Sequence, residues 1–352
     1  MTIRPQKFQK LILDWFDKHG RKHLPWQQNK TPYRVWISEI MLQQTQVTTV
    51  IPYYETFMRK FPSLSSLAKA NEDEVLHLWA GLGYYSRARN LHRAAKMVLQ
   101  EFKGKFPDNS EDLQKLPGIG QSTAGAILSI AFNQQAAILD GNVKRVLARF
   151  HGITQPVSEK NAENELWKYA EQYMPATRAA DYTQAMMDLG ATLCIRGNPE
   201  CHTCPLVKYC VAHQQGIAHL LPAKKTSRML PERSATFLIL QKNGDILLRK
   251  RPPMGIWGGL WSFPEMTGEP DLKTIQAYCR QYLHITIKHF EALTPFRHTF
   301  SHYHLHIHPV IIPITRMPGV IMEDDRQIWY NPHKPESVGL PKPVESIMKN
   351  LL

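Results

Sequence analysis

The sequence predicts a protein of two domains, an all-α domain followed by an α+β domain. In the first part, apolar residues such as Phe8, Leu11 and Ile12 recur at helical spacing, and strand-like alternation is scarce up to about residue 218. After residue 234 the pattern changes, because the apolar segments 236–240 and 245–248 flank an Asn-Gly turn, as in a β-hairpin.

A stretch that is rich in prolines and cations separates the two patterns. We therefore expect a helical domain over residues 1–220, a linker over 221–233 and an α+β domain over 234–352. The linker contains Lys224 and Lys225 and has little apolar content. A chain of 352 residues is long enough to give each domain a core of its own.

The chain is strongly basic, with a formal net charge of +13. This charge favours a polyanionic partner, since basic side chains gain free energy by releasing counterions from phosphates, although a merely basic soluble protein has the same composition. Four of the five cysteines form one tight cluster, which is typical of a reducing compartment. The N-terminal segment has no apolar signal-like run, and no apolar run is long enough for a membrane. We expect a cytoplasmic protein.

A helix is expected to begin at Thr31-Pro32 and to run to about Gln46, with proline at its first position. Glu39 interrupts the apolar stripe of this helix, beside residues such as Trp36. One interpretation is a glutamate at the margin of the stripe or paired with a base. The other is catalytic, because desolvation raises the pKa of a carboxyl and keeps it protonated, as a proton donor needs.

The stretch from Leu116 to Arg145 combines two features of a nucleic-acid site. Gly118 and Gly120 lie in a turn that lets backbone N–H groups approach a phosphate, and a small-residue helix follows, as in a helix-hairpin-helix. Asp140 ends an apolar run just before another helical pattern, where a helix N-terminus should keep it ionised. Taken separately, these features also fit an ordinary turn and an ordinary N-cap.

Cys194, Cys201, Cys204 and Cys210 have the spacing C-x6-C-x2-C-x5-C. Four thiolates so close together predict a metal site, and the spacing by itself leaves both zinc and an iron–sulfur cluster open. Cys279 lies apart from them and is expected to be a buried helix residue.

Together these motifs resemble the helix-hairpin-helix DNA glycosylases, and within them the MutY-like adenine DNA glycosylases, over most of the chain. The resemblance implies a base-excision repair enzyme that flips adenine out of duplex DNA, opposite 8-oxoguanine or guanine, and hydrolyses its glycosidic bond. It implies that Glu39 is the general acid, that Asp140 stabilises the oxocarbenium-like sugar, and that Tyr84 supports both. It further implies a bacterial protein that is a monomer and is associated with the nucleoid through DNA. Other repair proteins are possible partners.

The same resemblance implies one [4Fe–4S] cluster on the cysteines of the loop 194–210. It assigns Gln44 and Leu82 as residues that intercalate into the gap left by the flipped base. From the residue types alone, the segment around Leu82 and Tyr84 is a tight turn before a basic helix, with packing roles only. DNA contacts are expected from Gly118, Gly120, Ser122, Asn142 and Lys144.

Ser122 stands where strand-cleaving relatives of the endonuclease III type carry a lysine nucleophile, in a sequence like LPGVGRKTA. Since a serine cannot form a Schiff base, we expect a monofunctional glycosylase with little strand cleavage. Lys144 could give slow adventitious trapping, but a lysine that faces a phosphate or solvent is the simpler interpretation.

Residues 251–264 resemble the start of a Nudix-type domain, but residues 272–281 lack the clustered carboxylates of its metal-binding helix. Without them no Mg²⁺ can be held for pyrophosphate hydrolysis, so we expect a binding module. By resemblance, Phe300, Ser301 and His302 recognise 8-oxoguanine. The nearby alternating histidines are typical of a strand, with no accompanying carboxylate or cysteine that would favour a metal site.

Three alternatives remain open at this point. An endonuclease III-like glycosylase and lyase for damaged pyrimidines shares the fold and the cluster, but Ser122 and the second domain argue against it. An inactive DNA-binding or redox protein has no need of Glu39 and Asp140 together. A Nudix nucleotide hydrolase needs the acidic helix that this chain lacks.

Overall fold

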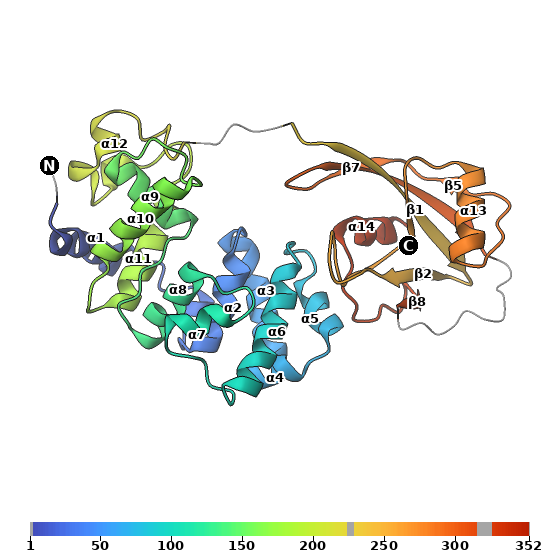
Figure 1. Cartoon of the computed structure of the whole chain (residues 1–352), viewed down its shortest axis with the longest axis horizontal. Helices are drawn as coiled ribbons and strands as arrows, with labels where there is room; N and C mark the ends of the chain where they lie inside the picture. The colour runs from blue at the N-terminus through green and yellow to red at the C-terminus, as the bar shows by residue number, and fades with distance from the viewer. Residues whose placement is uncertain (1–2, 224–228, 315–325, 352) are drawn as a thin grey trace. The chain divides into compact units, whose positions relative to one another are not determined.

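The computed structural model describes residues 3–223, 229–314 and 326–351 (Figure 1). Lys224 and Lys225 of the expected linker lie outside these described residues.

The chain forms two compact units. One unit comprises residues 1–69 with 90–227, and the other comprises residues 70–89 with 228–352. No pattern in the sequence indicates that residues 70–89 belong with the second unit. The domain limits expected from composition remain a prediction.

Helices build the first unit, and among the described residues no strand interrupts them. Helix α2 packs against α8, and α11 packs against α1, α8 and α9, so these helices share one core. No helix in the described ranges is both long and apolar enough to cross a membrane. The helices are α1 (Pro5–His19), η1 (Pro25–Gln27), α2 (Pro32–Leu42), α3 (Val47–Lys60), α4 (Leu64–Lys69), α6 (Ser86–Glu101, of which residues 86–89 belong to the second unit), α7 (Ser110–Lys115), α8 (Gln121–Phe132), α9 (Gly141–His151), α10 (Lys160–Tyr173), α11 (Ala179–Thr192), η2 (Cys201–Thr203), η3 (Val207–Tyr209) and α12 (Val211–Gln214).

Helix α2 begins where the sequence predicts and ends earlier. The Thr31 side chain caps it by accepting a hydrogen bond from the Arg34 backbone N–H, and Pro32 is its first residue. The expected end at Gln46 is wrong, because the helix stops at Leu42. Gln44 has a φ of 58°, a left-handed conformation that no helix can continue through.

The helix-hairpin-helix is present as α7, a short turn and α8. Gly118 has a φ of +83°, and a Cβ there would lie 3.0 Å from the Cβ of Asn90, so both conformation and space favour glycine. Gly120 is the N-cap of α8, and Asp140 is the N-cap of α9.

An eight-stranded mixed sheet forms the core of the second unit. The predicted hairpin is confirmed as β1 and β2, which pair antiparallel around Asn243 and Gly244, both with positive φ. The elements of this unit are α5 (Glu72–Trp79), β1 (Glu232–Lys242), β2 (Asp245–Lys250), β3 (Trp261–Ser262), β4 (Glu265–Thr267), α13 (Leu272–Tyr282), β5 (Glu291–Ala292), β6 (Phe296–Thr299), β7 (His304–Pro313), β8 (Gln327–Tyr330) and α14 (Lys342–Asn350).

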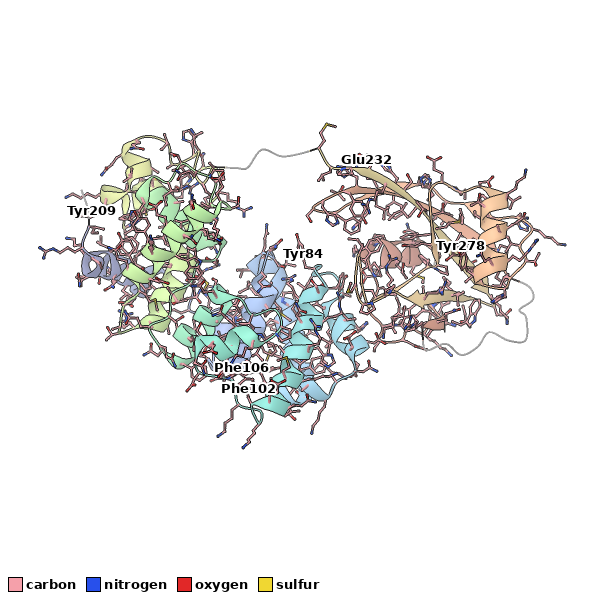
Figure 2. The ribbon with its side chains drawn as sticks, viewed as in Figure 1. Tyr84, Phe102, Phe106, Tyr209, Glu232 and Tyr278 are labelled. Atoms are coloured by element: carbon pink, nitrogen blue, oxygen red, sulfur yellow. The ribbon has the colours of Figure 1, made fainter. Side chains whose placement is uncertain are left out.

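The sheet has the strand order β3-β2-β1-β7-β5, and only the central pair, β1 and β7, is parallel. Helix α13 covers one face, where Ile275 and the fully buried Cys279 pack with Leu238 and Val310 of the sheet. Cys279 is therefore the buried helix residue that the sequence predicts, and Figure 2 labels Tyr278, its neighbour in the sequence of α13.

Candidate active site

One cavity in the first unit brings together five of the residues that the sequence singles out there, including both candidate catalytic carboxyls. It has a volume of about 430 Å³, which is large enough for a nucleobase and part of its sugar. It is formed by the end of α2, the turn after it, the first turns of α8 and α9, and one face of α11. Glu39, Gln44, Ser122, Asp140 and Asn142 all line it.

Glu39 projects from α2 into this cavity, between buried neighbours on both sides along the helix. Burial raises the pKa of its carboxyl from 4.5 to about 8, and the negative charge of Asp140 adds to the effect. Most Glu39 side chains are therefore protonated at neutral pH, as the sequence argument expects.

Asp140 also lines the cavity and has a different environment. Its Oδ1 accepts hydrogen bonds from the backbone N–H groups of Val143 (2.8 Å) and Asn142 (3.1 Å), and its Oδ2 accepts one from Asn142 Nδ2 (3.1 Å). Burial raises the pKa of Asp140 above its ordinary value, and these hydrogen bonds and the charge of Arg145 oppose the rise without cancelling it. The sequence predicts an ionised Asp140 from its helix N-terminus alone, and this burial is not visible there. The three donors stabilise the ionised form when it is present.

Ser122 and Asn142, which line the cavity, form hydrogen bonds with neighbouring segments of the first unit. The Oγ of Ser122 accepts a hydrogen bond from the Leu139 backbone N–H at 3.0 Å, which ties the start of α8 to the segment that ends in Asp140. Arg145, buried on α9, donates to Asn142 Oδ1 at 2.8 Å and to the Cys194 carbonyl at 2.7 Å. The Asp140 loop is thus joined to the cysteine loop through two side chains.

Sequence reasoning missed the polar residues on the remaining walls, Arg21 and Gln184, and the aromatic Trp26. Trp26 lies in η1 and contacts Tyr54 edge to face, with ring centroids 5.5 Å apart. None of these residues belongs to a motif. Gln184 interrupts a largely apolar segment, which was the one signal available, whereas Arg21 lies in a polar segment between Gly20 and Lys22.

Lys144 does not line the cavity. Its Nζ lies 2.5 Å from Glu163 Oε1, in an ion pair between α9 and α10. Its expected contact with DNA is untested.

Leu82 and Tyr84 belong to the second unit, so their expected roles beside the flipped base stay predictions. Leu82 is 6% exposed, whereas Tyr84, labelled in Figure 2, is 49% exposed and has a φ of 47°. An exposed aromatic ring held in a left-handed turn suits a base contact better than a buried leucine does.

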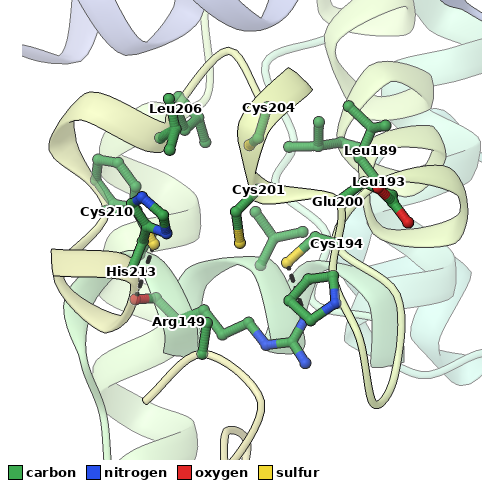
Figure 3. A pocket seen from close by; sticks show the side chains of 15 residues that line it. Arg149, Leu189, Leu193, Cys194, Glu200, Cys201, Cys204, Leu206, Cys210 and His213 are labelled. Atoms are coloured by element: carbon green, nitrogen blue, oxygen red, sulfur yellow. Dashed lines mark hydrogen bonds between the residues drawn. The ribbon is translucent and has the colours of Figure 1, made fainter. Parts of the chain in front are cut away.

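The four clustered cysteines surround a second cavity of the first unit (Figure 3). Arg149 of α9 donates from Nη1 to Cys194 Sγ at 3.3 Å, and its carbonyl accepts a hydrogen bond from Cys210 Sγ at 3.4 Å. Burial raises the pKa of Cys204 to about 12, and its three cysteine neighbours add to the effect. The negative charges of four thiolates at this site would therefore have to be neutralised by a cationic group.

Four cysteines that line one cavity form a donor set that fits either a zinc ion or an iron–sulfur cluster, because both accept four thiolates.

The predicted recognition segment of the second unit forms the turn between β6 and β7. The Phe300 N–H donates to the Tyr303 carbonyl at 2.9 Å, and Ser301 and His302 lie exposed at the tip. Phe300 contacts Trp257, with ring centroids 5.1 Å apart. A cavity of about 430 Å³ adjoins this turn.

Two segments of the chain match known protein families. Residues 37–172 match the family described as HhH-GPD superfamily base excision DNA repair protein, and residues 235–350 match the NUDIX domain. Among solved structures, a thermostable thymine-DNA glycosylase covers 60% of this chain and 97% of its own, at 28% identity and a TM-score of 0.54. An endonuclease III–DNA complex shares the fold of the helical part at 20% identity, with a TM-score of 0.52, and covers 61% of this chain and 99% of its own.

Relatives of nearly full length define the family. The adenine DNA glycosylase of Buchnera aphidicola subsp. Acyrthosiphon pisum is 41% identical over 97% of both chains. The human adenine DNA glycosylase is 38% identical over 85% of this chain and 65% of its own. The chain belongs to the adenine DNA glycosylase family. This confirms the resemblance inferred from the motifs, and it disfavours the alternative of a pyrimidine-specific lyase.

Proposed function

We propose that the protein hydrolyses the N-glycosidic bond of adenine mispaired with 8-oxoguanine or guanine in duplex DNA. The observation that carries the proposal is the pair of carboxyl groups, Glu39 and Asp140, in one base-sized cavity but with different hydrogen-bond environments. Glu39 has a raised pKa and can donate a proton, while three N–H donors favour the ionised form of Asp140. Cleavage of a glycosidic bond needs one group of each kind.

In the proposed reaction the adenine leaves the stack and enters the cavity, where Trp26 supplies an aromatic wall. Glu39 protonates a nitrogen of the imidazole ring of adenine, which makes the base a better leaving group. The carboxylate of Asp140 then stabilises the positive charge that develops on the sugar. Water completes the hydrolysis.

Arg21 and Gln184 are the polar groups suited to select the base. Both line the cavity, and both carry hydrogen-bonding groups that are held in place by neighbouring side chains. A buried site with fixed hydrogen-bonding groups discriminates strongly against a base that leaves them unpaired.

The proposed enzyme is monofunctional and cuts the strand little. Ser122 already accepts the Leu139 N–H and cannot form a Schiff base, and the Lys144 amine is paired with Glu163. The helix-hairpin-helix would bind the DNA backbone through N–H groups near Gly118 and Gly120. Gln44, in its left-handed turn at the mouth of the cavity, would fill the gap in the duplex.

Two other sites complete the proposal. Phe300, Ser301 and His302 would recognise 8-oxoguanine, since they combine an aromatic ring with exposed polar groups on one turn. The four cysteines would hold a [4Fe–4S] cluster, which would keep the loop 194–210 folded and, through Arg145, steady the Asp140 loop.

A duplex with one adenine–8-oxoguanine pair tests the proposal, scored for free adenine and for strand breaks with and without alkali. We expect adenine release, with breaks appearing mainly after alkali. Breaks without alkali would point to a lyase that uses an amine of the protein. Tight binding without adenine release would contradict the proposed hydrolysis.

A further inference from the structure

Asp188 lies on α11, one helical turn beyond Gln184, and its side chain is fully buried. It does not line the catalytic cavity. It contacts two residues that do, Arg21 and Gln184, which the proposed function uses to select the base. Asp188 itself has no part in the reaction described above.

Four N–H donors converge on the Asp188 carboxylate. Arg21 supplies its backbone N–H to Oδ2 at 2.8 Å, and its Nε and Nη2 to Oδ1 at 2.9 and 2.7 Å. Gln184 Nε2 donates to the same Oδ1 at 2.8 Å. The guanidinium balances the buried negative charge, and the hydrogen bonds satisfy the carboxylate. Asp188 thus holds both residues at once.

This contact determines which way the Gln184 amide points. A carboxylate accepts hydrogen bonds and cannot donate them, so the end of the amide that faces Asp188 must be its NH₂. The other end, Oε1, accepts a hydrogen bond from Gln27 Nε2 and keeps a second lone pair. A flipped amide would set Oε1 against the carboxylate and would lose both hydrogen bonds.

We infer that Asp188 is a positioning residue for base selection, because it holds Gln184 so that an acceptor is offered to the flipped base. The inference rests on the proposed function. An acceptor suits the exocyclic amino group of adenine. It disfavours hypoxanthine, which carries a carbonyl at the same ring position.

The test compares single-turnover excision of adenine and of hypoxanthine by the full-length protein, from duplexes that are otherwise identical and contain 8-oxoguanine opposite. Asp188→Asn keeps the size of the side chain but adds an N–H donor, so the Gln184 amide can turn over. We expect the ratio of the adenine to the hypoxanthine rate constant to fall about tenfold or more. Simple loss of stability would lower both rate constants alike and leave the ratio unchanged.

Asp181→Asn is the matched control. Asp181 lies on the same helix, and its carboxylate pairs at 2.9 Å with Arg178 while being 37% exposed. This variant should keep the wild-type ratio. A fall as large as that of Asp188→Asn would overturn the inference, because any loss of a carboxylate from α11 would then suffice.

An unchanged ratio for Asp188→Asn overturns the inference. If that variant does not fold, Asp188→Ser replaces it, since a hydroxyl can donate as well as accept a hydrogen bond and no longer fixes the orientation of the Gln184 amide. An unchanged ratio there has the same meaning. If the wild-type protein releases no adenine, both the proposed function and this inference are wrong. Adenine release with an unaffected ratio would remove the inference alone.

Discussion

The burial of Glu39 raises the pKa of its carboxyl, which suits a proton donor but lowers the stability of the folded state. Its carboxyl titrates near pH 8 in the fold and near its ordinary value of 4.5 in the unfolded chain. Below pH 4.5 both states hold the proton. As the pH rises from there to about 8, the unfolded chain loses the proton while the folded protein keeps it, so the fold loses stability.

We predict that Glu39→Gln abolishes adenine release and stabilises the fold, by about 1–3 kcal/mol at pH 8.5 and much less at pH 5. Glutamine fills the same space without a charge to desolvate. Thermal unfolding at the two pH values measures the effect. A stability difference that does not grow with pH would show that Glu39 has an ordinary pKa.

The wild-type excision rate should fall as the pH rises through about 8, because only protonated Glu39 can act as the acid. Single-turnover rates between pH 6 and 9 measure this dependence. A rate that stays level across that range would remove Glu39 from the role of proton donor.

Asp140 gives a complementary prediction. Asp140→Asn should lower the rate of adenine release by about 10³-fold, because the neutral amide no longer stabilises the sugar cation. DNA binding should persist, since asparagine is as good an N-cap as aspartate for α9. Release assays and binding titrations on the same preparation test both parts. A variant that keeps wild-type rates would refute the assignment.

The sequence indicates which residue types do the chemistry but not all of their neighbours. Glu39 and Asp140 could be found because a carboxylate in an apolar stripe and a carboxylate before a helix are local patterns. Arg21, Gln184 and Asp188 could not, because they meet only when α1 packs against α11. Their network depends on tertiary contacts that no spacing encodes.

Helices α2 and α9 were predictable at their beginnings, because Thr31 with Pro32, and Asp140, are local capping signals. The end of α2 was not, because the left-handed backbone of Gln44 has no marker such as a following glycine. The grouping of α5 with the second unit likewise follows from packing, although its capping box at Asn71 predicts the helix itself.

The turn between α7 and α8 supports a prediction about DNA binding. Gly118→Ala should destabilise the fold by about 1–3 kcal/mol, since alanine disfavours a φ of +83° and its Cβ would press on Asn90. Any shift of the turn should also weaken binding of undamaged duplex. Thermal unfolding and a binding titration measure the two effects.

Gly216→Ala is the matched control for that variant. Gly216 has a similar φ of +70°, but nothing lies within 4 Å of an added Cβ. It should lose some stability and keep its affinity for DNA. If the two variants bind DNA equally well, the turn does not contact the backbone.

The chain as a whole combines a helical unit that holds the catalytic cavity with a sheet unit whose Nudix-type helix lacks clustered acids. Both unit types could be predicted from sequence, because the change from helical to strand periodicity is a property of long segments. The net charge of +13 fits a protein that binds DNA.

We predict that Ser301→Ala and His302→Ala each reduce the preference for 8-oxoguanine over guanine opposite adenine, by about tenfold. Excision rates from the two duplexes give this preference directly. His289→Ala, at an exposed histidine outside the β6–β7 turn, should leave it unchanged. An unaltered preference in both turn variants would remove this segment from the recognition of the opposite base.

The parallel pairing of β1 with β7 also bears on synthesis by the ribosome. Residues 232–241 emerge first, but their central partner, residues 304–313, follows only after most of the sheet unit has been translated. During that interval β1 has an unpaired apolar edge, the kind of surface at which nascent chains associate wrongly. Slow translation of the intervening segment would prolong this exposure, so the yield of active protein should depend on codon choice between β2 and β7.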